Sequence, residues 1–373
     1  MIEWQNGIHI KGTNFWLDAR KKVDFSFISH AHIDHAVRHK EILATKETAR
    51  LYEHRFGKAK FNILEYNEPK RFDSAYGGTH PTYGPKFVKP KSEEGIKVEL
   101  FPSGHILGGA QILLEIGGVR IVYTGDFNLR KCLTAKKAEI KKCDILIMES
   151  TFGLPRYIFP DRKEIIDQIT EFVDQALSFG QVPIFLAYSL GKAQEIMKIL
   201  GNQGYKISVH KAIFKIAKIY EEFGVRFKNY EHYPAKSGQT TARLGGSAYG
   251  RQAEDLEGKV LVVPPYLRGS PMIEKIPKKR IAILTGWAID SGSKGWFNVD
   301  EAFPLSDHAD FSELMEYAKL AEPQKVYTVH GFPEFPDFLR QEGFDAEQLK
   351  ESNKVTETFS KELLLNYDLF IRD

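Results

Sequence analysis

The stretch FSFISHAHIDH, residues 25–35, places four side chains with metal-binding chemistry directly after an apolar run. The apolar half is typical of a buried β-strand. Because alternate residues of a strand project to one side, His30 and His32 can face one metal ion. A turn then lets Asp34 and His35 reach a second ion. The alternative is that these side chains only decorate a surface turn.

Two further candidate ligands stand where apolar runs end. His105 follows KVELFPSG, and Asp126 follows VRIVYTG. Alone, each is a common turn residue. Together with the first cluster they supply what two metal ions need, because the carboxylate of Asp126 has two oxygens and can bridge them. Imidazole and carboxylate ligands suit Zn²⁺ or Mn²⁺.

Outside these motifs, the first part of the chain is rich in short β-like runs, and we expect packed sheets. A helix is predicted over residues 46–56, and residues 66–94 form a polar insertion that we expect to be a long loop. The predicted strands are GIHI, FWLD, FSFIS, KVELFPS, QILLEIG, VRIVYTG and DILIMES.

After Pro160 the pattern changes to helices alternating with apolar strands, which is typical of an α/β domain. Helices are predicted over residues 162–177 and 192–200, and strands at VPIFLA, VLVVPP and IAILTG. The motif-bearing sequence resumes at residue 304 with PLSDHAD. We therefore predict an inserted domain, with boundaries 1–160, 161–300 and 301–373.

The charge of the chain is unevenly distributed. The net charge is +3, but residues 201–280 contain 15 Lys or Arg against 7 Asp or Glu, which leaves −5 for the remainder. A concentrated positive field suits a polyanion such as nucleic acid, because binding releases the counterions of its phosphates. Solvated lysines on ordinary helices are the alternative.

The motifs HAHIDH, SGH at 103–105 and TGDF at 124–127 resemble the metallo-β-lactamase superfamily. ESTFG at 149–153, SDHAD at 306–310 and VHG at 329–331 resemble its β-CASP nuclease branch. The resemblance covers nearly the whole chain. It implies an α/β fold, with a four-layer αββα sandwich and an inserted α/β β-CASP domain, and the activity of a metal-dependent phosphodiesterase.

The resemblance also implies roles for individual residues. It puts His30, His32 and His105 on the first metal, Asp34, His35 and His330 on the second, and Asp126 between them. Asp18 in FWLDAR matches a supporting aspartate, and Glu149 matches an acidic residue that orients His308. We expect Asp34, His308 and Glu149 to be catalytic, with His308 as the proton donor for the leaving oxygen.

Among β-CASP proteins, the strings FWLDAR, ESTFGLP, AYSLGKAQEI, TGWA and FPLSDHADF resemble the prokaryotic ligase-associated DNA exonucleases. They resemble the mRNA 3′-end processing exonuclease-like proteins and, more distantly, the Artemis-type crosslink-repair nucleases. The implied activity is 5′-to-3′ exonuclease action on single-stranded DNA in repair. RNA processing is the alternative, favoured by Glu149 at the acidic motif and by His330.

Exonuclease action from a 5′ end requires a phosphate pocket, for which Arg268 and Ser270 are candidates, although a plain strand-to-helix turn explains them equally. Lys211, Lys215 and Lys218 recur at helical spacing and could follow a phosphate backbone, or form a solvated helix face. Tyr66, Tyr76 and Tyr83 could stack bases or simply pack.

The remaining expectations concern partners and setting. A small-molecule metallo-hydrolase is a further alternative, but it needs no long basic surface. We expect no export signal or membrane span, a prokaryotic cytoplasm, and no disulfide between Cys132 and Cys143. A homodimer and DNA-repair helicase or ligase partners are compatible with the resemblance.

Overall fold

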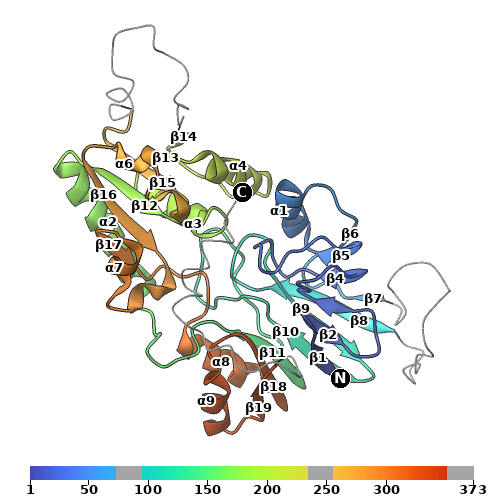
Figure 1. Cartoon of the computed structure of the whole chain (residues 1–373). Helices are drawn as coiled ribbons and strands as arrows, with labels where there is room; N and C mark the ends of the chain where they lie inside the picture. Colours follow the sequence, from blue (N-terminus) through green and yellow to red (C-terminus); the bar gives the residue numbers. More distant parts are fainter. Residues whose placement is uncertain (73–94, 234–254, 351–373) are drawn as a thin grey trace. The chain divides into compact units, whose positions relative to one another are not determined.

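The computed structural model of the protein describes residues 1–72, 95–233 and 255–350 (Figure 1). The chain forms two compact units. The first contains residues 1–158 and the described residues from 308 onwards, and the second contains residues 159–307. The predicted domain boundaries, 1–160, 161–300 and 301–373, stay a prediction. None of the described helices is long and apolar enough to cross a membrane.

The first unit contains a six-stranded sheet whose strands lie side by side in chain order. Its first three strands pair antiparallel, and the strands from the third to the sixth pair parallel. The strands are β1 (Ile2–Trp4), β2 (Ile8–Ile10), β3 (Trp16–Leu17), β4 (Phe25–Phe27), β5 (Glu41–Ala44) and β6 (Phe61–Ile63).

A second, seven-stranded sheet of this unit has the order β19-β18-β11-β10-β9-β8-β7. Strands β7 to β10 pair antiparallel, whereas β10, β11, β18 and β19 pair parallel. The strands are β7 (Lys70–Phe72), β8 (Ile96–Pro102), β9 (Ala110–Ile116), β10 (Val119–Tyr123), β11 (Ile145–Ser150), β18 (Lys325–Gly331) and β19 (Ala346–Gln348).

The two sheets share one core, in which Phe27 of the first sheet and Leu100 and Ile112 of the second are fully buried. Helix α1 (Lys46–Phe56) packs through Tyr52 onto the outer face of the first sheet. Helices α8 (Phe311–Ala321) and α9 (Phe335–Gln341) pack onto the outer face of the second. The layers are therefore α, β, β and α, as predicted (Figure 1).

The second unit is built on a six-stranded parallel sheet. Along β15, Val260 and Val262 pack on one face, while Leu261 and Val263 pack on the other, as expected for a strand buried on both sides. In spatial order the strands are β14 (Tyr230–His232), β13 (Lys206–Val209), β15 (Lys259–Val263), β12 (Val182–Leu186), β16 (Lys279–Leu284) and β17 (Glu301–Phe303).

Helices cover both faces of this sheet, which confirms the predicted α/β character. One face packs against the three longer helices, α2 (Arg162–Ser178), α3 (Lys192–Asn202) and α4 (Lys211–Glu222). The other packs against short elements, namely η1 (Pro265–Leu267), α6 (Pro271–Glu274) and α7 (Ser293–Phe297). A further short turn, η2 (Gly286–Ile289), follows β16.

Helix α8 begins with a reciprocal cap inside the SDHAD motif. The Asp310 carboxylate accepts from the Glu313 N–H, and the Glu313 carboxylate accepts from the Asp310 N–H, each at 3.0 Å. Arg130 forms ion pairs with both carboxylates. Burial raises the pKa of Glu313 to about 7, against the attraction of Arg130. This cap ties the segment that follows His308 to the loop after β10.

The raised pKa of Glu313 predicts how stability changes with pH. Between the unfolded pKa of about 4.5 and the folded pKa of about 7, the folded state binds the extra proton. This contribution is complete below pH 4.5 and is lost as the pH rises through 7, about 3 kcal/mol at most. Glu313→Gln should flatten the dependence of the unfolding free energy on pH in this interval, as measured by urea denaturation. The exposed Glu316→Gln on the same helix is the control, and an unchanged pH slope in Glu313→Gln would contradict the assignment.

Candidate metal centre

The topology of the first unit gathers side chains that are far apart in the sequence. Asp18 and His30 follow β3 and β4, which are parallel neighbours, so both stand at the carboxyl end of the first sheet. In the second sheet β8, β10, β11 and β18 run in one direction. His105, Asp126, Glu149 and His330 stand at their carboxyl ends. The prediction that His105 and Asp126 lie at strand ends is confirmed.

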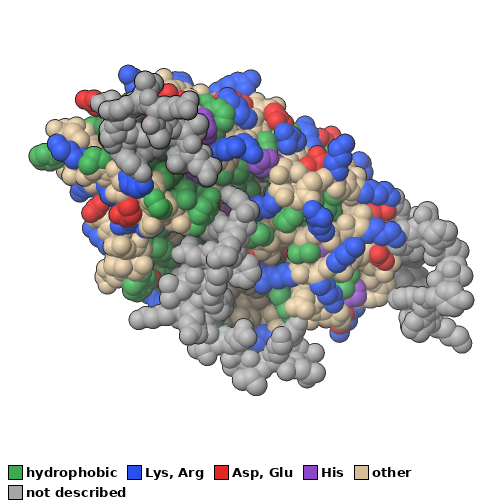
Figure 2. Space-filling view, turned by 45° about the horizontal axis from the view of Figure 1, so that its top comes forward, with side chains coloured by type: hydrophobic (Ala, Val, Ile, Leu, Met, Phe, Trp, Pro, Cys, Tyr) green, Lys and Arg blue, Asp and Glu red, His purple; other side chains and the backbone are tan. Residues whose placement is uncertain are grey.

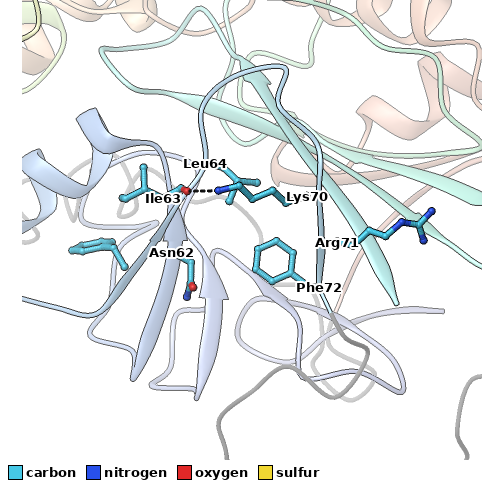
Figure 3. Close-up of a pocket in the computed structure, with 7 residues that line it drawn as sticks. Asn62, Ile63, Leu64, Lys70, Arg71 and Phe72 are labelled. Atoms are coloured by element: carbon cyan, nitrogen blue, oxygen red, sulfur yellow. Dashed lines mark hydrogen bonds between the residues drawn. The ribbon is translucent and has the colours of Figure 1, made fainter. Parts of the chain in front are cut away.

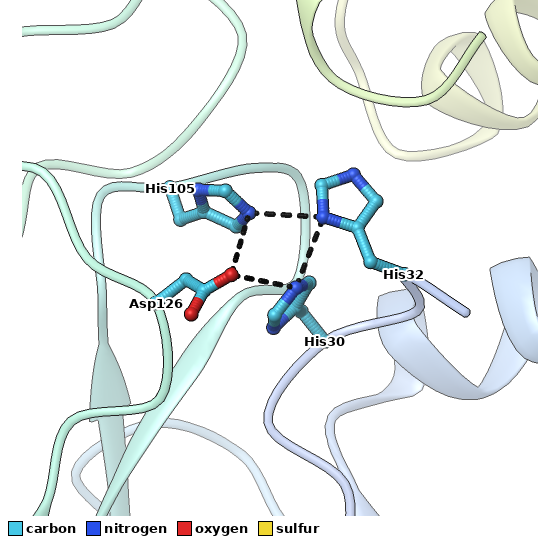
Figure 4. Close-up of side chains that lie close together, drawn as sticks. All are labelled: His30, His32, His105 and Asp126. Atoms are coloured by element: carbon cyan, nitrogen blue, oxygen red, sulfur yellow. Dashed lines mark hydrogen bonds and ion pairs between the residues drawn. The ribbon is translucent and has the colours of Figure 1, made fainter. Parts of the chain in front are cut away.

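The donor atoms of His30, His32, His105 and Asp126 converge on one point (Figure 4). His32 Nδ1 lies 3.0 Å from His30 Nε2 and 3.1 Å from His105 Nε2. Asp126 Oδ2 lies 3.4 Å from His30 Nε2 and 3.8 Å from His105 Nε2. Four ligands at Zn–N distances of 2.0–2.1 Å around a tetrahedral ion would be about 3.3 Å apart. The spacing and the chemistry of the four donors fit a divalent zinc-like ion.

The second predicted set is less compact. His35 Nε2 lies 3.5 Å from Asp34 Oδ2 and 3.4 Å from Asp126 Oδ2. The rings of His35 and His330 are 5.2 Å apart. Within the described residues, the groups whose donors all gather within 4.8 Å include Asp126 or His105, and none contains Asp34, His35 or His330. The assignment of these three to a second metal stays a prediction.

His330 owes its position to a β-bulge. Glu149 pairs with Val329 and Ser150 pairs with Gly331, so His330 is the extra residue of β18, with a left-handed φ of 51°. A Cβ on Gly331 would lie 1.8 Å from the Ser150 carbonyl oxygen, so glycine is required for this approach. The bulge turns the His330 ring toward His35.

The Nδ1 atom of His330 has an unexpected hydrogen-bond partner, Arg20. Arg20 Nη2 donates to His330 Nδ1 at 2.9 Å. Since Nδ1 accepts, the neutral ring carries its proton on Nε2. Coordination through Nε2 therefore requires Arg20 to leave Nδ1. Burial and the neighbouring guanidinium hold the pKa of His330 well below its usual range.

A single buried carboxylate orients two of the histidines. Asp18 accepts hydrogen bonds from the Ser29 N–H and hydroxyl, from His35 Nδ1 and from the Tyr123 hydroxyl, at 2.6–2.8 Å. Since the Ser29 hydroxyl donates to Asp18, it accepts from His30 Nδ1, at 2.9 Å. In its neutral form each of these histidines therefore holds its proton on Nδ1, which directs Nε2 toward Asp126. Asp18 would exercise its predicted supporting role through these four hydrogen bonds.

His308 and Glu149 form a pair beside this cluster. His308 Nδ1 lies 3.0 Å from Glu149 Oε2, and its Nε2 lies 3.9 Å from Asp126 Oδ2. Glu149 is fully buried and also accepts from the Phe127 N–H at 2.8 Å and the Thr151 hydroxyl at 2.6 Å. The His308 side chain remains 19% exposed. The imidazole is thus held by Nδ1 and directs Nε2 toward Asp126.

The electrostatics of the cluster favour a cation. Burial alone opposes the ionisation of Asp126, but His35, His308 and His30 hold its pKa well below the usual range. Burial would lower the pKa of His35, yet Asp126, Asp34 and Asp18 raise it well above the usual range. By contrast, burial and the neighbouring His35 hold the pKa of His30 low, which leaves a neutral ligand.

Two family models match the chain. Residues 12–147 match the metallo-beta-lactamase superfamily, and residues 301–351 match the Zn-dependent metallo-hydrolase RNA specificity domain. The chain belongs to the metallo-β-lactamase superfamily, in its β-CASP branch. The predicted family is confirmed. The chain is therefore a member of a nuclease family of metallo-hydrolases.

The curated relatives include a protein named as a DNA ligase and others named as ribonucleases. A probable DNA ligase of Opitutus terrae is 32% identical over 357 residues, which cover 95% of this chain but only 31% of that protein. An RNase J-like protein of Methanocaldococcus jannaschii is 25% identical, covering 83% of this chain and 82% of the relative. RNase aCSPSF2 of Saccharolobus solfataricus is 23% identical, covering 86% and 72%.

The residues of the predicted phosphate pocket lie in the second unit, where the Arg268 side chain already has two partners within the protein. Arg268 Nε donates to the Asn298 carbonyl at 2.6 Å, and Nη1 pairs with Glu274 at 2.9 Å. Ser270 stands at the N-cap position of the four-residue helix α6 but makes no capping hydrogen bond, and its hydroxyl is buried without a partner among the described residues. A phosphate at Arg268 would compete with Glu274, and the pocket stays a prediction.

The predicted lysines share one side of α4. Lys211, Lys215 and Lys218 are all exposed, and Lys218 also pairs with Glu221 at 2.9 Å. On the face that Figure 2 shows, Lys and Arg side chains predominate over Asp and Glu. The α4 lysines are available to a polyanion, and their role in binding stays a prediction.

The predicted stacking tyrosines divide into two groups. The Tyr66 hydroxyl donates to the Gly109 carbonyl at 2.9 Å, and its ring packs against the core between the sheets. This favours the packing alternative for Tyr66. Tyr76 and Tyr83 lie outside the described residues. Cys132 and Cys143 are buried and are not joined by a disulfide.

A separate pocket lies at the common edge of the two sheets, between β6 and β7 (Figure 3). Lys70 Nζ donates across it to the Ile63 carbonyl at 3.4 Å. Its lining contains no histidine or carboxylate, so it offers no counterpart to the metal cluster. The lining residues are Phe61, Asn62, Ile63, Leu64, Lys70, Arg71 and Phe72.

Sequence reasoning missed Ser29, Tyr123 and Arg20. Each stands within or beside a recognised motif, but a motif does not reveal which neighbour accepts a proton from which. The only available signal was position, since Ser29 precedes His30 and Arg20 ends FWLDAR.

Asp18→Asn should weaken metal binding. The amide cannot accept all four hydrogen bonds, so the proton positions on His30 and His35 are no longer fixed. Loss of such a supporting group typically costs 10-fold to 100-fold in metal affinity. Chelator competition followed by elemental analysis measures this, with the exposed Asp24→Asn as the control. Equal affinity in the two variants would refute the role of Asp18.

Proposed function

We propose that this chain hydrolyses phosphodiester bonds of nucleic acid, as a 5′-to-3′ exonuclease of single-stranded DNA. The observation that carries the hydrolytic part is the side-by-side arrangement of two groups in the first unit. One is the His30, His32, His105 and Asp126 cluster, and the other is the His308–Glu149 pair, whose Nε2 faces Asp126. A metal-ligand set with an adjacent proton donor is what phosphodiester hydrolysis requires.

The proposed ligand sets follow from the donors. His30, His32 and His105 hold one ion, Asp34, His35 and His330 hold the other, and Asp126 is shared. Two divalent ions, Zn²⁺ by preference or Mn²⁺, would supply an activated water and neutralise charge on the phosphate. The 3.0–3.8 Å donor spacing supports the first set. For the second, the hydrogen bond from Arg20 must first leave His330.

The proposed proton donor is His308. Its Nδ1 is bound by Glu149, whose buried carboxylate is fixed by two further hydrogen bonds. Glu149 therefore fixes the orientation of the imidazole, and Nε2 is the ring nitrogen that faces Asp126. Transfer of a proton from Nε2 to the leaving oxygen avoids release of an alkoxide. Asp34, with a side chain 39% exposed, stands on the accessible side of His35 and is the third proposed catalytic residue.

The proposal also specifies which nucleic acid, DNA or RNA, is hydrolysed. DNA is supported by the similarity of 95% of this chain to a segment of a probable DNA ligase. RNA is the second candidate, supported by the match of residues 301–351 to an RNA specificity domain and by the relatives named as RNases. A role in DNA repair and a ligase or helicase partner rest on the DNA alternative.

One digestion experiment distinguishes these alternatives. Matched single-stranded DNA and RNA oligonucleotides, labelled at either end, are incubated with the protein and either Zn²⁺ or Mn²⁺. The proposal expects shortening of DNA from the 5′ end. Faster digestion of RNA transfers the proposal to RNA processing, and no digestion of either polymer overturns it.

His308→Ala should lower the turnover number by about 10²-fold to 10⁴-fold, the usual span for a general acid. Metal content should be unchanged, because His308 lies beside the metal cluster and is not assigned as a ligand. Single-turnover rates and elemental analysis measure the two quantities. His54→Ala, on the exposed side of α1, is the control. Wild-type turnover in His308→Ala would remove the assignment.

A further inference from the structure

Three consecutive cations, Arg20, Lys21 and Lys22, follow the buried Asp18 and begin at the metal centre. All three are exposed. Within the described residues none of them forms an ion pair with a carboxylate, in contrast to Lys218 of α4. The three residues are called the Arg20 track. A solvated charge run is the ordinary explanation for such a segment.

Two tryptophans contact Arg20 and Lys21, so these two side chains do not move freely in solvent. The Arg20 guanidinium carbon lies 5.8 Å from the centre of the Trp4 ring, and Lys21 Nζ lies 4.6 Å from that of Trp16. Trp4 also meets His330 edge-on, with ring centres 5.8 Å apart. Cation–π contacts of this length restrict where the two charges lie. They also leave the N–H groups pointing away from the rings available to an anion.

The backbone that carries the track is itself fixed. The Arg20 N–H donates to the Asn6 carbonyl at 2.8 Å, and the Asp18 N–H donates to the Phe27 carbonyl at 2.9 Å. Gly7 lies so close to this segment that a Cβ would meet Ala19 Cα at 2.6 Å. Asp18 adopts a left-handed φ of 45°. Little conformational entropy is therefore lost when a ligand binds here.

The position of Arg20 points to a phosphate. One of its five side-chain N–H donors is used on His330, and the others have no hydrogen-bond acceptor among residues 1–72, 95–233 and 255–350. A guanidinium beside a cluster that favours cations is repelled by any metal bound there. A phosphate between them removes that repulsion and accepts a two-point hydrogen bond from Arg20.

We propose that the Arg20 track binds the backbone of single-stranded nucleic acid at phosphates next to the scissile one, with Arg20 nearest the metal centre and Lys21 and Lys22 beyond it. This rests on the proposed function and adds a contact surface in the first unit to the α4 lysines of the second. Arg20 exchanges His330 Nδ1 for the phosphate, so binding of the strand also frees the His330 ring to turn its lone pair toward the metal centre.

The test is the salt dependence of binding, measured in His308→Ala protein with its metals so that turnover is suppressed. Fluorescence anisotropy with a labelled 12-nucleotide single strand, as DNA and as RNA, gives the dissociation constant from 50 to 200 mM salt. Each phosphate contact contributes about 0.7 to the slope of log K against log salt concentration for single strands. Arg20→Gln should therefore reduce the slope by about 0.7, and Lys21→Gln with Lys22→Gln by about 1.4.

The control is Lys58→Gln, which removes one exposed charge next to β6, at the opposite edge of the sheet from β1. It should leave the slope unchanged. The double lysine variant does not touch His330, so its effect cannot arise from the metal site, and elemental analysis checks the metal content of Arg20→Gln. An unchanged slope in the double variant, or an effect of Arg20→Gln found only with metal loss, overturns the track. If the His308→Ala protein without further substitutions binds neither the DNA nor the RNA strand, the proposed function fails as well.

Discussion

The metal centre depends on the buried carboxylate of Asp18. It is a hydrogen-bond acceptor for the loop that carries His30 and His35 and for Tyr123 of the neighbouring sheet. One group thereby joins the two sheets and fixes the protons of two imidazoles. The cost is a buried charge in a left-handed backbone conformation. Such a conformation persists only where surrounding contacts determine it, as they do here.

Around this fixed point, the direction of the strands accounts for the rest of the cluster. Strands of both sheets end at the same side of the sandwich, so loops separated by hundreds of residues deliver single side chains to one place. The exception is His330, which stands within β18. There the regular pleat alone does not set the direction of the ring. The bulge opposite Glu149 and Ser150 does so, and it requires glycine at position 331.

Much of this could be predicted from sequence, because the informative signals are local. Helix 46–56 has the predicted bounds, since its hydrophobic period and its Thr45 cap lie within a few residues. Ten of the nineteen described strands were predicted for the same reason. The nine that were not are β1, β5, β6, β7, β13, β14, β17, β18 and β19, and all of these except β18 have only three or four residues, which carry little periodicity. Strand β7 lies within residues 66–94, so the prediction of a long loop was wrong at that point. Side-chain partners across the fold have no local signal. The Asp18–Ser29–His30 chain, the partner of Arg268 and the bond from Arg20 to His330 therefore emerged only from the structure.

The bond between Arg20 and His330 also shows why the two halves of the centre differ. On the His30 side, the hydrogen bond from His30 Nδ1 to Ser29 leaves Nε2 of the neutral ring as a lone-pair donor, so this ligand is prepared for a cation before anything binds. On the His330 side a guanidinium occupies Nδ1 and leaves the proton on Nε2, so the ring is prepared to meet an anion first. A phosphodiester carries the charge that satisfies Arg20 and the oxygens that a metal attracts. Under the proposed function, this asymmetry would couple completion of the second half of the centre to the arrival of the substrate.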